Sequence, residues 1–432
     1  MNEHTKRRVL AWLIVASMAP LPFLVKLPTW NIPSSVWLYA SAVTGYVGLV
    51  MLLWMYILGA KSVMGLYFAD LAPVLSIHKW LGKYGTLAVF FHPIATAISY
   101  GDNLISYALV PNLSQSFERS VTWGRFALYA LLVVWVTSAL IRGRIAFRPW
   151  KYIHYLSYAA LPLALVHVPS IGSSYRSLDF PRVYLMSIVA LLVIFSVLRL
   201  RHLFSLGRVR YTVVKQAEIS PGVYMILLQP HGREITVSRG QYLYLQTSLL
   251  GEEHPFSVLQ HDVTTGNITV AYKLFGSWTE KLSQVGEGAS VFVDGPYGEF
   301  TEEVNADPAA PRVFIAGGIG ITPFVDHVLS EQNADQWLFH ACKVPEEAPF
   351  SAQLRQRLGS RYVSIFSRVN TPAGPSDERG RISAEILARY LPDPAHYHYY
   401  LCGSDGFMQT TADSLTSLGV PSAHIHREAF SW

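Results

Sequence analysis

Four histidines lie in apolar stretches of the chain at two nearly equal separations, and they are the residues best placed to do chemistry. His78 and His92 are 14 residues apart (92 minus 78), and His154 and His167 are 13 apart (167 minus 154). A helix rises about 1.5 Å per residue, so each separation spans about 20 Å, most of a bilayer. Ionisable side chains in hydrocarbon are costly and usually face a partner, a cavity or a cofactor. Two helices that each offer one imidazole near either membrane face could hold two stacked haems by bis-histidine ligation.

The apolar residues are concentrated in roughly the first 200 positions, although hydrophobic residues make up 51% of the whole chain and charged residues 15%. Six stretches there approach the roughly 20 residues that a membrane-crossing helix needs. We expect the first stretch to be retained rather than cleaved as a signal peptide, because its small residues run directly into Pro20 and further apolar sequence. The expected helices are Val9–Leu27, Val36–Leu58, His78–Tyr100, Arg125–Ile141, Tyr152–Ile171 and Arg182–Leu200.

Basic residues gather in alternate connections between these stretches, which predicts that both termini face the cytoplasm of a bacterial inner or plasma membrane. On that topology His78 and His154 lie near the cytoplasmic face, and His92 and His167 near the opposite face. The two pairs therefore match in depth. The net charge of +5 follows largely from topology, so the lipid bilayer is the expected partner and nucleic acid is not.

The angular positions of the histidines are less regular. At about 100° per residue, the 14-residue separation returns to within about 40° of the same helix face, but the 13-residue separation leaves the second imidazole about 140° away. Pro162 lies between His154 and His167, so we expect that helix to be distorted near Pro162, and Pro93 to bend the third stretch. Three basic residues are either partners of haem carboxylates or headgroup charges: Arg125, Arg148 and Lys151.

From about Arg208 the pattern changes to short alternating strands with turns between them, which predicts an antiparallel β-barrel. After about Asn305, apolar strands alternate with helical stretches, which predicts a parallel sheet with crossover helices. Only two cysteines occur, both in this half, so a disulfide scaffold is excluded and a reduced compartment fits. We therefore expect a multidomain chain: an all-α transmembrane domain at 1–205, a β-barrel at 206–305 and an α/β domain at 306–432.

Two short motifs in the predicted barrel suit a flavin nucleotide. The segment His254-Pro255-Phe256-Ser257 places a flat ring and a small hydroxyl on one strand, which suits stacking on a flavin and hydrogen bonding to its edge. About twenty residues later, a second group combines a cation, a tight turn and a helix start, where backbone N–H groups favour a pyrophosphate. Residues that serve only the barrel would explain either motif as well. The second group is Lys273, Gly276, Ser277, Trp278 and Thr279.

A glycine-rich loop follows the first apolar strand of the α/β half. Its glycines allow close approach to the backbone, and its threonine and proline suit the first positions of a helix. The loop is not the G-x-G-x-x-G of the Rossmann fingerprint. A cysteine and a glycine end a later strand, where open parallel sheets bind their ligands. The candidate residues are Gly317, Gly318, Gly320, Thr322, Pro323, Cys402 and Gly403.

Together, the histidine spacing and these motifs resemble the superfamily of NADPH oxidases and ferric reductases, over about residues 78–432 and in the family's order. The resemblance implies a six-helix haem domain joined to a ferredoxin-NADP reductase-like module that binds FAD and a nicotinamide dinucleotide. It implies that His78 with His154 ligates one b haem and that His92 with His167 ligates a second.

The same resemblance assigns the soluble motifs. The segment 254–257 resembles the family's FAD motif, and the segment 273–279 resembles its pyrophosphate motif, with lysine where arginine is usual. The loop 317–323 matches the family's nicotinamide-dinucleotide loop. Cys402 and Gly403 match the motif near the nicotinamide ring.

Further positions concern the specificity and movement of these cofactors. Ser367 and Arg368 follow a strand, like the serine–arginine pair that binds the 2′-phosphate in NADP-dependent relatives, which favours NADPH over NADH. A solvated loop arginine is the alternative. Phe430 resembles the family's terminal ring that covers the flavin and must move for hydride transfer, with Trp432 as the other choice. Phe430 and Cys402 are therefore the catalytic candidates.

The sequence predicts an NAD(P)H oxidase or ferric-chelate reductase that moves electrons from NADPH through FAD and two b haems to an acceptor across the membrane. Two acceptors stay open: oxygen, reduced to superoxide, and chelated ferric iron. Family oxidases carry polar groups beside the outer haem, whereas this chain has Thr96 one turn beyond His92 and no arginine in its second stretch, which counts against oxygen. One alternative is a haem-bearing subunit that passes electrons to a periplasmic protein or quinone. Another is a soluble-type reductase tethered by inert helices.

Overall fold

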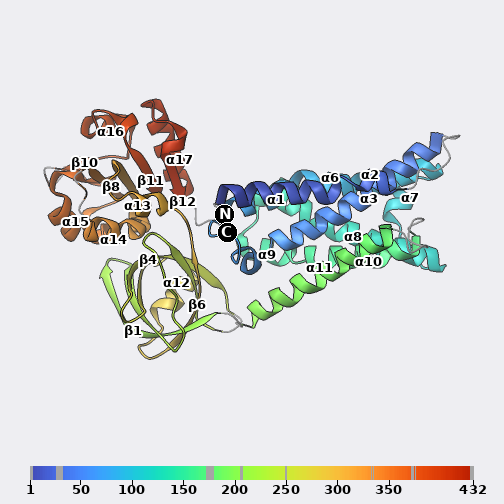
Figure 1. The fold of residues 1–432 in the computed structure, drawn as a ribbon, viewed down its shortest axis with the longest axis horizontal. Helices are drawn as coiled ribbons and strands as arrows, with labels where there is room; N and C mark the ends of the chain where they lie inside the picture. Colours follow the sequence, from blue (N-terminus) through green and yellow to red (C-terminus); the bar gives the residue numbers. More distant parts are fainter. Residues whose placement is uncertain are drawn as a thin grey trace. The chain divides into compact units, whose positions relative to one another are not determined.

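The computed structural model of this chain describes residues 3–25, 33–171, 180–204, 208–248, 251–331, 333, 335–370, 374 and 376–428. The chain divides into two compact units, Met1–Leu200 and Arg201–Trp432 (Figure 1). The first unit is helical, and the second is built mainly from two β-sheets.

The first unit is a set of helices that lie side by side (Figure 1). Their bounds are α1 Glu3–Met18, α2 Leu21–Leu24, α3 Pro33–Leu58, α4 Lys61–Met64, α5 Ala72–Trp80, α6 Thr86–Tyr100, α7 Leu104–Leu109, α8 Ser116–Trp135, α9 Phe147–His154, α10 Ser157–Ile171 and α11 Phe180–Leu203. α3 packs along α6, and α8 packs along α10. In the described part of the chain, three helices are long and apolar enough to cross a membrane: Ser35–Leu58, Ser116–Leu140 and Arg182–His202. The six predicted stretches are helical over most of their described length, but the count of six spans stays a prediction.

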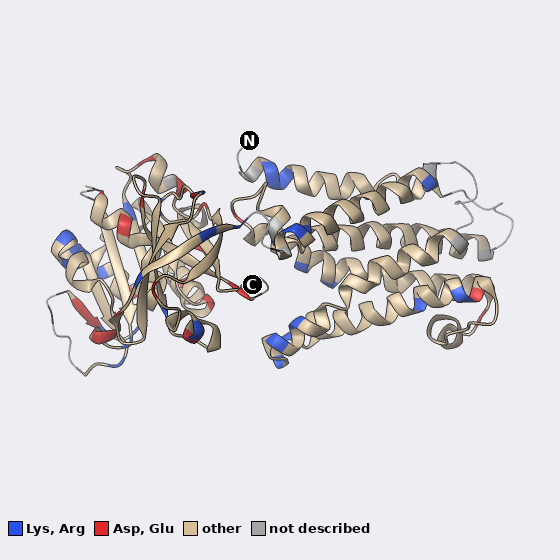
Figure 2. Cartoon of the chain, turned by 90° about the horizontal axis from the view of Figure 1, so that it is seen from below, with Lys and Arg blue, Asp and Glu red and all other residues tan. Residues whose placement is uncertain are grey.

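The side chains of the first unit suit a lipid environment. Charged residues gather towards the ends of the helices and leave the middle sections nearly free of them (Figure 2). Large apolar side chains are exposed along the helices, among them Trp12, Val166, Val193 and Val197. Water does not favour so many exposed apolar side chains, whereas hydrocarbon does. The first unit therefore belongs in a membrane.

Helix irregularities lie beside the histidines, but one is not where the sequence predicted it. α10 continues through Pro162, and the irregularity that was expected between His154 and His167 lies nearer to His154. The chain bends instead between α9 and α10, at Tyr155 and Leu156, directly after His154. His154 ends α9 and His167 lies on α10, so the two histidines belong to separate helices. They need not share one face of a straight helix. Two π-helical segments are also present. η1, Leu81–Gly85, directly precedes α6, and η2, Val136–Leu140, directly follows α8.

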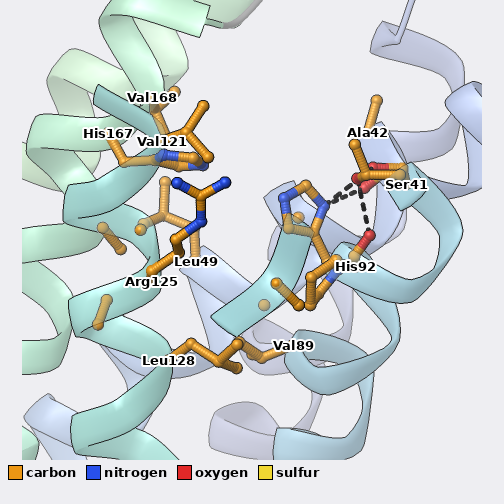
Figure 3. A pocket seen from close by; sticks show the side chains of 18 of the residues that line it. Ser41, Ala42, Leu49, Val89, His92, Val121, Arg125, Leu128, His167 and Val168 are labelled. Carbon is orange, nitrogen blue, oxygen red and sulfur yellow. Dashed lines mark hydrogen bonds between the residues drawn. The ribbon is translucent and has the colours of Figure 1, made fainter. Parts of the chain in front are cut away.

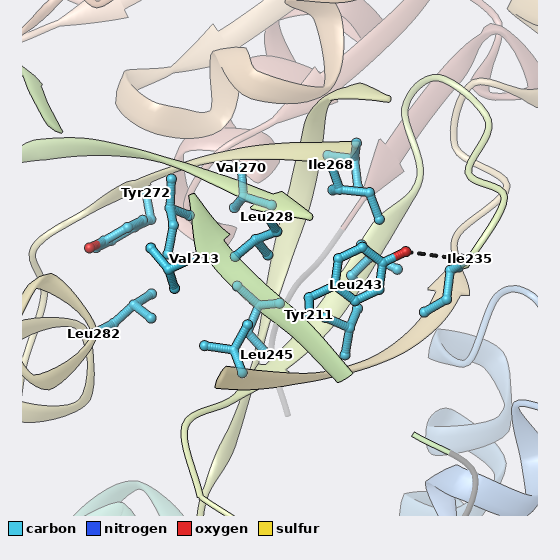
Figure 4. Packing of buried hydrophobic residues seen from close by; sticks show 14 of the residues in the cluster. Tyr211, Val213, Leu228, Ile235, Leu243, Leu245, Ile268, Val270, Tyr272 and Leu282 are labelled. Atoms are coloured by element: carbon cyan, nitrogen blue, oxygen red, sulfur yellow. Dashed lines mark hydrogen bonds between the residues drawn. The ribbon is translucent and has the colours of Figure 1, made fainter. Parts of the chain in front are cut away.

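The second unit begins with an antiparallel sheet, as predicted. Its strands are β1 Val209–Ser220, β2 Val223–Pro230, β3 Tyr242–Gln246, β4 Glu253–Asp262, β5 Asn267–Lys273 and β6 Ser290–Tyr297. They close into a barrel in the order β1-β2-β5-β4-β3-β6, and the short helix α12, Ser277–Ser283, follows β5. Alternate side chains fill the barrel, with Tyr211, Leu228, Leu243 and Val270 at its centre (Figure 4). The hydroxyl of Tyr211 accepts the backbone N–H of Ile235 at 2.9 Å, which satisfies a polar atom in this core.

The rest of the second unit is a parallel sheet with crossover helices, also as predicted. Its strands are β7 Arg312–Gly317, β8 Gln336–Cys342, β9 Tyr362–Phe366, β10 Asp377–Arg379, β11 His398–Cys402 and β12 Ile425–Glu428. The strands lie in the order β10-β9-β8-β7-β11-β12. All of them are parallel, but the chain adds strands on one side of β7 up to β10 and then reverses to add β11 and β12 on its other side. Ligands of such sheets bind beyond the carboxyl ends of the strands at this reversal. The helices are α13 Glu302–Ala306, α14 Thr322–Ser330, α15 Ser351–Leu358, α16 Ala384–Tyr390 and α17 Asp405–Ser417.

Candidate functional site

His92 on α6 and His167 on α10 face each other inside the first unit, with ring centres 6.4 Å apart and ring planes at 85°. Nδ1 of His92 lies 2.8 Å from the carbonyl oxygen of Ser41, and Nδ1 of His167 lies 2.9 Å from that of Ser120. A carbonyl oxygen only accepts hydrogen bonds, so each Nδ1 carries the proton and each Nε2 keeps its lone pair. Figure 3 shows the other ring nitrogen of His92 turned away from Ser41, towards His167.

Two glycines make room for these rings, and sequence reasoning missed both. A Cβ at Gly45 of α3 would lie 2.9 Å from Nδ1 of His92, and a Cβ at Gly124 of α8 would lie 2.6 Å from Nδ1 of His167. Close packing leaves no space for such a contact, so a larger residue would displace the ring. The only sequence signal was a glycine inside an apolar helical stretch, which usually has a packing or functional reason.

The His78–His154 pair has nearly the same separation, with ring centres 6.2 Å apart and ring planes at 68°. Nδ1 of His78 lies 3.1 Å from the carbonyl oxygen of Met55. Nδ1 of His154 lies 3.2 Å from the hydroxyl of Ser138, and the Trp150 ring stacks on the His154 ring with centres 4.9 Å apart. The structure thus brings the four predicted histidines together as two pairs.

The separations of these rings fit imidazoles that ligate one metal ion from opposite sides. A metal–imidazole bond is about 2.0 Å long and the nitrogen lies about 1.1 Å from the ring centre, so opposed ligands place the centres about 6.2 Å apart. The observed separations are 6.4 and 6.2 Å. Histidines that ligate a metal usually donate the other ring N–H to a carbonyl or a similar partner, as three of these four do. The residues present therefore fit bis-histidine haem ligation at both levels.

A cavity of about 240 Å³, lined mostly by apolar side chains, contacts His92 and His167. Arg125 of α8 also lines this cavity, although its side chain is only 6% exposed (Figure 3). Arg125 donates Nε–H to the carbonyl of Tyr107 at 2.8 Å, and its Nη1 lies 3.7 Å from the carboxylate of Glu118. A held positive charge therefore lies beside the His92–His167 pair.

The predicted flavin motif lies on β4 against α12. The His254 and Trp278 ring centres are 4.3 Å apart, and Phe256 stacks on Trp278 with centres 5.6 Å apart and planes at 25°. Pro255 lies between them in the strand, and Ser257 is buried. Trp278 came from the predicted pyrophosphate motif, but it is buried in the barrel core. It supports the rings of the flavin motif.

The rest of the predicted pyrophosphate motif forms the turn before α12. Gly276 has φ +84°, a conformation that favours glycine, and α12 begins at Ser277. Thr279 donates its hydroxyl to the carbonyl of Gly276 at 3.0 Å and so closes the turn. Lys273 donates to the carboxylate of Glu347 at 2.7 Å, and this hydrogen bond lowers the pKa of Glu347. Sequence reasoning missed this ion pair, because Glu347 lies far along the chain.

The glycine loop after β7 packs against the loop after β11, where the strand order reverses. A Cβ at Gly320 would lie 2.5 Å from the carbonyl oxygen of Cys402. A Cβ at Gly317 or at Gly403 would lie 3.0 or 2.7 Å from the ring of Phe407. These glycines are therefore needed for the two loops to meet, whatever the loops bind. Phe407 carried no recognisable signal in the sequence.

A buried histidine holds the tip of the same loop. His340 of β8 places Nε2 2.9 Å from the carbonyl oxygen of Gly318, which has φ +56°, and Nδ1 3.1 Å from the hydroxyl of Tyr362. Burial lowers the pKa of His340 to about 4, so the ring is neutral at pH 7. It then donates Nε2–H to Gly318 and accepts the hydroxyl proton of Tyr362. Thr322 and Pro323 begin α14 after this loop.

Cys402 ends β11 as a buried thiol. Burial and then the nearby carboxylate of Glu428 raise the pKa of Cys402 well above its usual range. The Glu428 carboxylate also lies against the barrel, where a Cβ at Gly298 would be 2.8 Å from Oε1. At neutral pH Cys402 therefore stays protonated and cannot act as a nucleophile.

Ser367 and Arg368 are exposed directly after β9, at the carboxyl end of the sheet. The backbone N–H of Arg368 donates to the carbonyl of Lys343 at 2.9 Å, which places two basic residues together there. The predicted ring Phe430, and the alternative Trp432, lie outside the described residues.

Two protein families match the chain. The family of ferric reductase like transmembrane components matches residues 44–165, which hold three of the four paired histidines. The oxidoreductase NAD-binding domain matches residues 314–413, which hold the glycine loop and Cys402. Among solved structures, the flavohemoglobin from Malassezia yamatoensis is similar with a TM-score of 0.48 and 19% identity, over 97% of this chain and 98% of that one. The FAD/NAD-binding domain of nitric oxide dioxygenase from Vibrio cholerae has a TM-score of 0.45 and 25% identity, over 51% and 98%.

Curated relatives match part of the chain. A flavohemoprotein from Bacillus cereus is 27% identical over 246 residues, 51% of this chain and 60% of that protein. One from Bordetella pertussis is 31% identical over 168 residues, 34% of this chain and 39% of that protein. The carnitine monooxygenase reductase subunit of Escherichia coli is 30% identical over 125 residues, 28% and 36%. The chain thus spans 60% or less of the length of these relatives. The chain therefore joins a region like the ferric reductase transmembrane components to an oxidoreductase NAD-binding domain, which supports its resemblance to the superfamily of ferric reductases and NADPH oxidases.

Proposed function

We propose that this protein moves electrons from cytoplasmic NADPH, through FAD and two b haems, to an acceptor on the opposite side of the membrane. One observation carries the proposal. Two histidine pairs occur at two levels of one helical unit, and their ring centres are 6.2 and 6.4 Å apart. A structural histidine needs one hydrogen-bond partner and has no reason to face a second imidazole at this distance.

The residues of the chain would position the cofactors. A bound FAD would supply the chemistry that accepts a hydride and passes electrons on one at a time. The glycine loop after β7 would admit the dinucleotide, with His340 fixing the carbonyl of Gly318. His254 and Phe256 would contact the flavin, and Cys402 would meet the nicotinamide as a neutral thiol. Phe430 would cover the flavin until the nicotinamide enters.

The residues around the His92–His167 pair bear on the acceptor. The second helical stretch has no arginine, but Arg125 of α8 brings a guanidinium to the same cavity. Thr96 and Ser41 add hydroxyls, and the oxygen atoms of Ser41 lie 2.8 and 3.1 Å from Nδ1 of His92. A positive charge there would stabilise superoxide and would equally attract an anionic ferric chelate. Both acceptors therefore stay in the proposal.

One experiment separates these acceptors. NADPH is supplied to the purified protein, and dye reduction with and without superoxide dismutase is compared with reduction of a ferric chelate under nitrogen. An oxidase gives dye reduction that dismutase abolishes. A ferric reductase gives chelate reduction and dye reduction that dismutase leaves unchanged. Reduced haem with slow turnover of both acceptors would instead favour a subunit that serves a periplasmic protein or quinone. A protein without b-type absorption would leave a reductase tethered by inert helices.

A further inference from the structure

Arg199 is a charged residue near the carboxyl end of α11, the helix with the highest mean hydropathy of the three candidate spans. It lies on α11 within the candidate membrane span Arg182–His202. A guanidinium in hydrocarbon is costly unless it has a partner or reaches water. Within the described part of the chain, no carboxylate forms an ion pair with Arg199, and its Nη1 is buried without a hydrogen-bond partner. Sequence reasoning assigned Arg199 no role other than that of a basic residue at the end of the last helix.

Arg199 is held in place by aromatic side chains. Its Nη2 donates a hydrogen bond to the hydroxyl of Tyr158, and its guanidinium carbon lies 4.4 Å from the centre of the Tyr158 ring. Tyr158 packs edge-on against Tyr56, with ring centres 5.8 Å apart, and the Tyr56 hydroxyl lies 2.7 Å from that of Ser196 on α11. This packing fixes a long side chain that would otherwise extend to the membrane surface.

The same contacts place Arg199 beside the His78–His154 pair. Tyr158 is one helical turn beyond His154 across the break between α9 and α10. Tyr56, which packs on Tyr158, follows Met55, and the carbonyl oxygen of Met55 lies 3.1 Å from Nδ1 of His78. A cation such as Arg199 gains no ion pair from two neutral imidazoles. Within the described residues its guanidinium therefore lacks an anionic partner. The Tyr158 hydroxyl accepts from Arg199 and therefore keeps its own proton to donate.

We infer that Arg199 and Tyr158 form a carboxylate-binding site for the group that His78 and His154 hold. This inference rests on the proposed function, in which that group is a b haem, and the carboxylate is one of its propionates. Nη1 of Arg199 and the hydroxyl of Tyr158 are the available donors. A fixed positive charge favours the reduced form of a nearby haem, so Arg199 raises the potential of this haem relative to a site without it.

The test is a redox titration of the purified, haem-loaded protein in the wild type and in Arg199→Met. The component that belongs to His78 and His154 is the one that His154→Ala lacks. In Arg199→Met its midpoint potential should fall while the other component stays constant. The control is Arg201→Met. Arg201 lies two residues further along α11 and its side chain is exposed, so this variant should change neither potential. Two components with unchanged potentials in Arg199→Met would overturn the inference and leave the proposed function standing. A wild type without b-type haem would instead overturn the proposed function.

Tyr158→Phe keeps the experiment decisive if Arg199→Met does not accumulate. It removes one donor and keeps the ring that packs against Arg199. The same component should shift in the same direction by a smaller amount. An unchanged potential in Tyr158→Phe, together with an unchanged potential in Arg199→Gln, contradicts a carboxylate at this site.

Discussion

The backbone at Gly124 approaches His167 so closely that a Cβ at this position would lie 2.6 Å from Nδ1 of the imidazole. We therefore predict that Gly124→Ala displaces the His167 ring and removes about half of the haem from the purified protein. Gly143→Ala is the matched control, because a Cβ there meets no atom within 4 Å. Haem content per chain, from the pyridine haemochrome spectrum, is the measurement. Equal haem content in both variants, with equal helicity by circular dichroism, contradicts the role of Gly124.

The ion pair between Lys273 and Glu347 should compete with a flavin pyrophosphate for the lysine. Glu347→Gln frees the ammonium, so the affinity for FAD should rise by about fivefold, which corresponds to ~1 kcal/mol for a partly exposed pair. Glu346→Gln, on an exposed neighbour, should leave the affinity unchanged. Titration of the apoprotein with FAD, followed by flavin fluorescence, measures both. A lower affinity in Glu347→Gln would mean that Lys273 does not contact the pyrophosphate.

Arg368 should decide between NADPH and NADH. Loss of its guanidinium removes a charge-assisted hydrogen bond to a 2′-phosphate, which is worth about 1.5–3 kcal/mol. Arg368→Ala should therefore raise KM for NADPH by roughly tenfold or more and leave KM for NADH nearly constant. Arg381→Ala removes another exposed arginine of the same domain and serves as the control. Parallel changes in both KM values would contradict 2′-phosphate recognition by Arg368.

His340 should make the second unit sensitive to acid. Its native pKa is about 4, below its ordinary value of 6.5, so between these pH values the unfolded chain binds a proton that the native chain does not. The free energy of unfolding should therefore fall as pH drops from 6.5 towards 4, by at most about 1.4 kcal/mol per pH unit from this group. His340→Phe lacks this component but is less stable at pH 7 by about 1–3 kcal/mol, because the Gly318 carbonyl loses its donor.

The matching experiment follows flavin release from the full-length protein on heating, at pH 5 and at pH 7. The wild type should lose more stability between these pH values than His340→Phe does. His231→Phe, at an exposed histidine of the barrel, should behave like the wild type. An identical pH dependence in the wild type and His340→Phe rules out a neutral, buried His340 as the source.

The sequence predicted those features that follow from a regular pattern within one helix or strand. The depth of His78, His92, His154 and His167 follows from helical rise, and the two kinds of sheet follow from alternation and crossover lengths. It could not predict contacts between elements far apart in the chain. Gly124 meets His167 only because α8 packs on α10.

The same limit explains the other findings. The break between α9 and α10 lies at Tyr155 and Leu156, where neither glycine nor proline marks it, so the sequence pointed to Pro162 instead. Lys273 carried the composition of an anion site, but its partner Glu347 comes from a segment 74 residues later. The boundary near residue 305 between barrel and parallel sheet, and the orientation of the termini, stay predictions.

The central claim is that the two histidine pairs hold two haems that NADPH can reduce. The most direct measurement is the optical spectrum of the purified protein, taken anaerobically before and after NADPH, with haem and FAD quantified on the same sample. We predict two low-spin b haems per FAD, both reduced by NADPH, and one remaining in His167→Ala. A wild type without b-type haem, or a His167→Ala variant that keeps both haems, would contradict it.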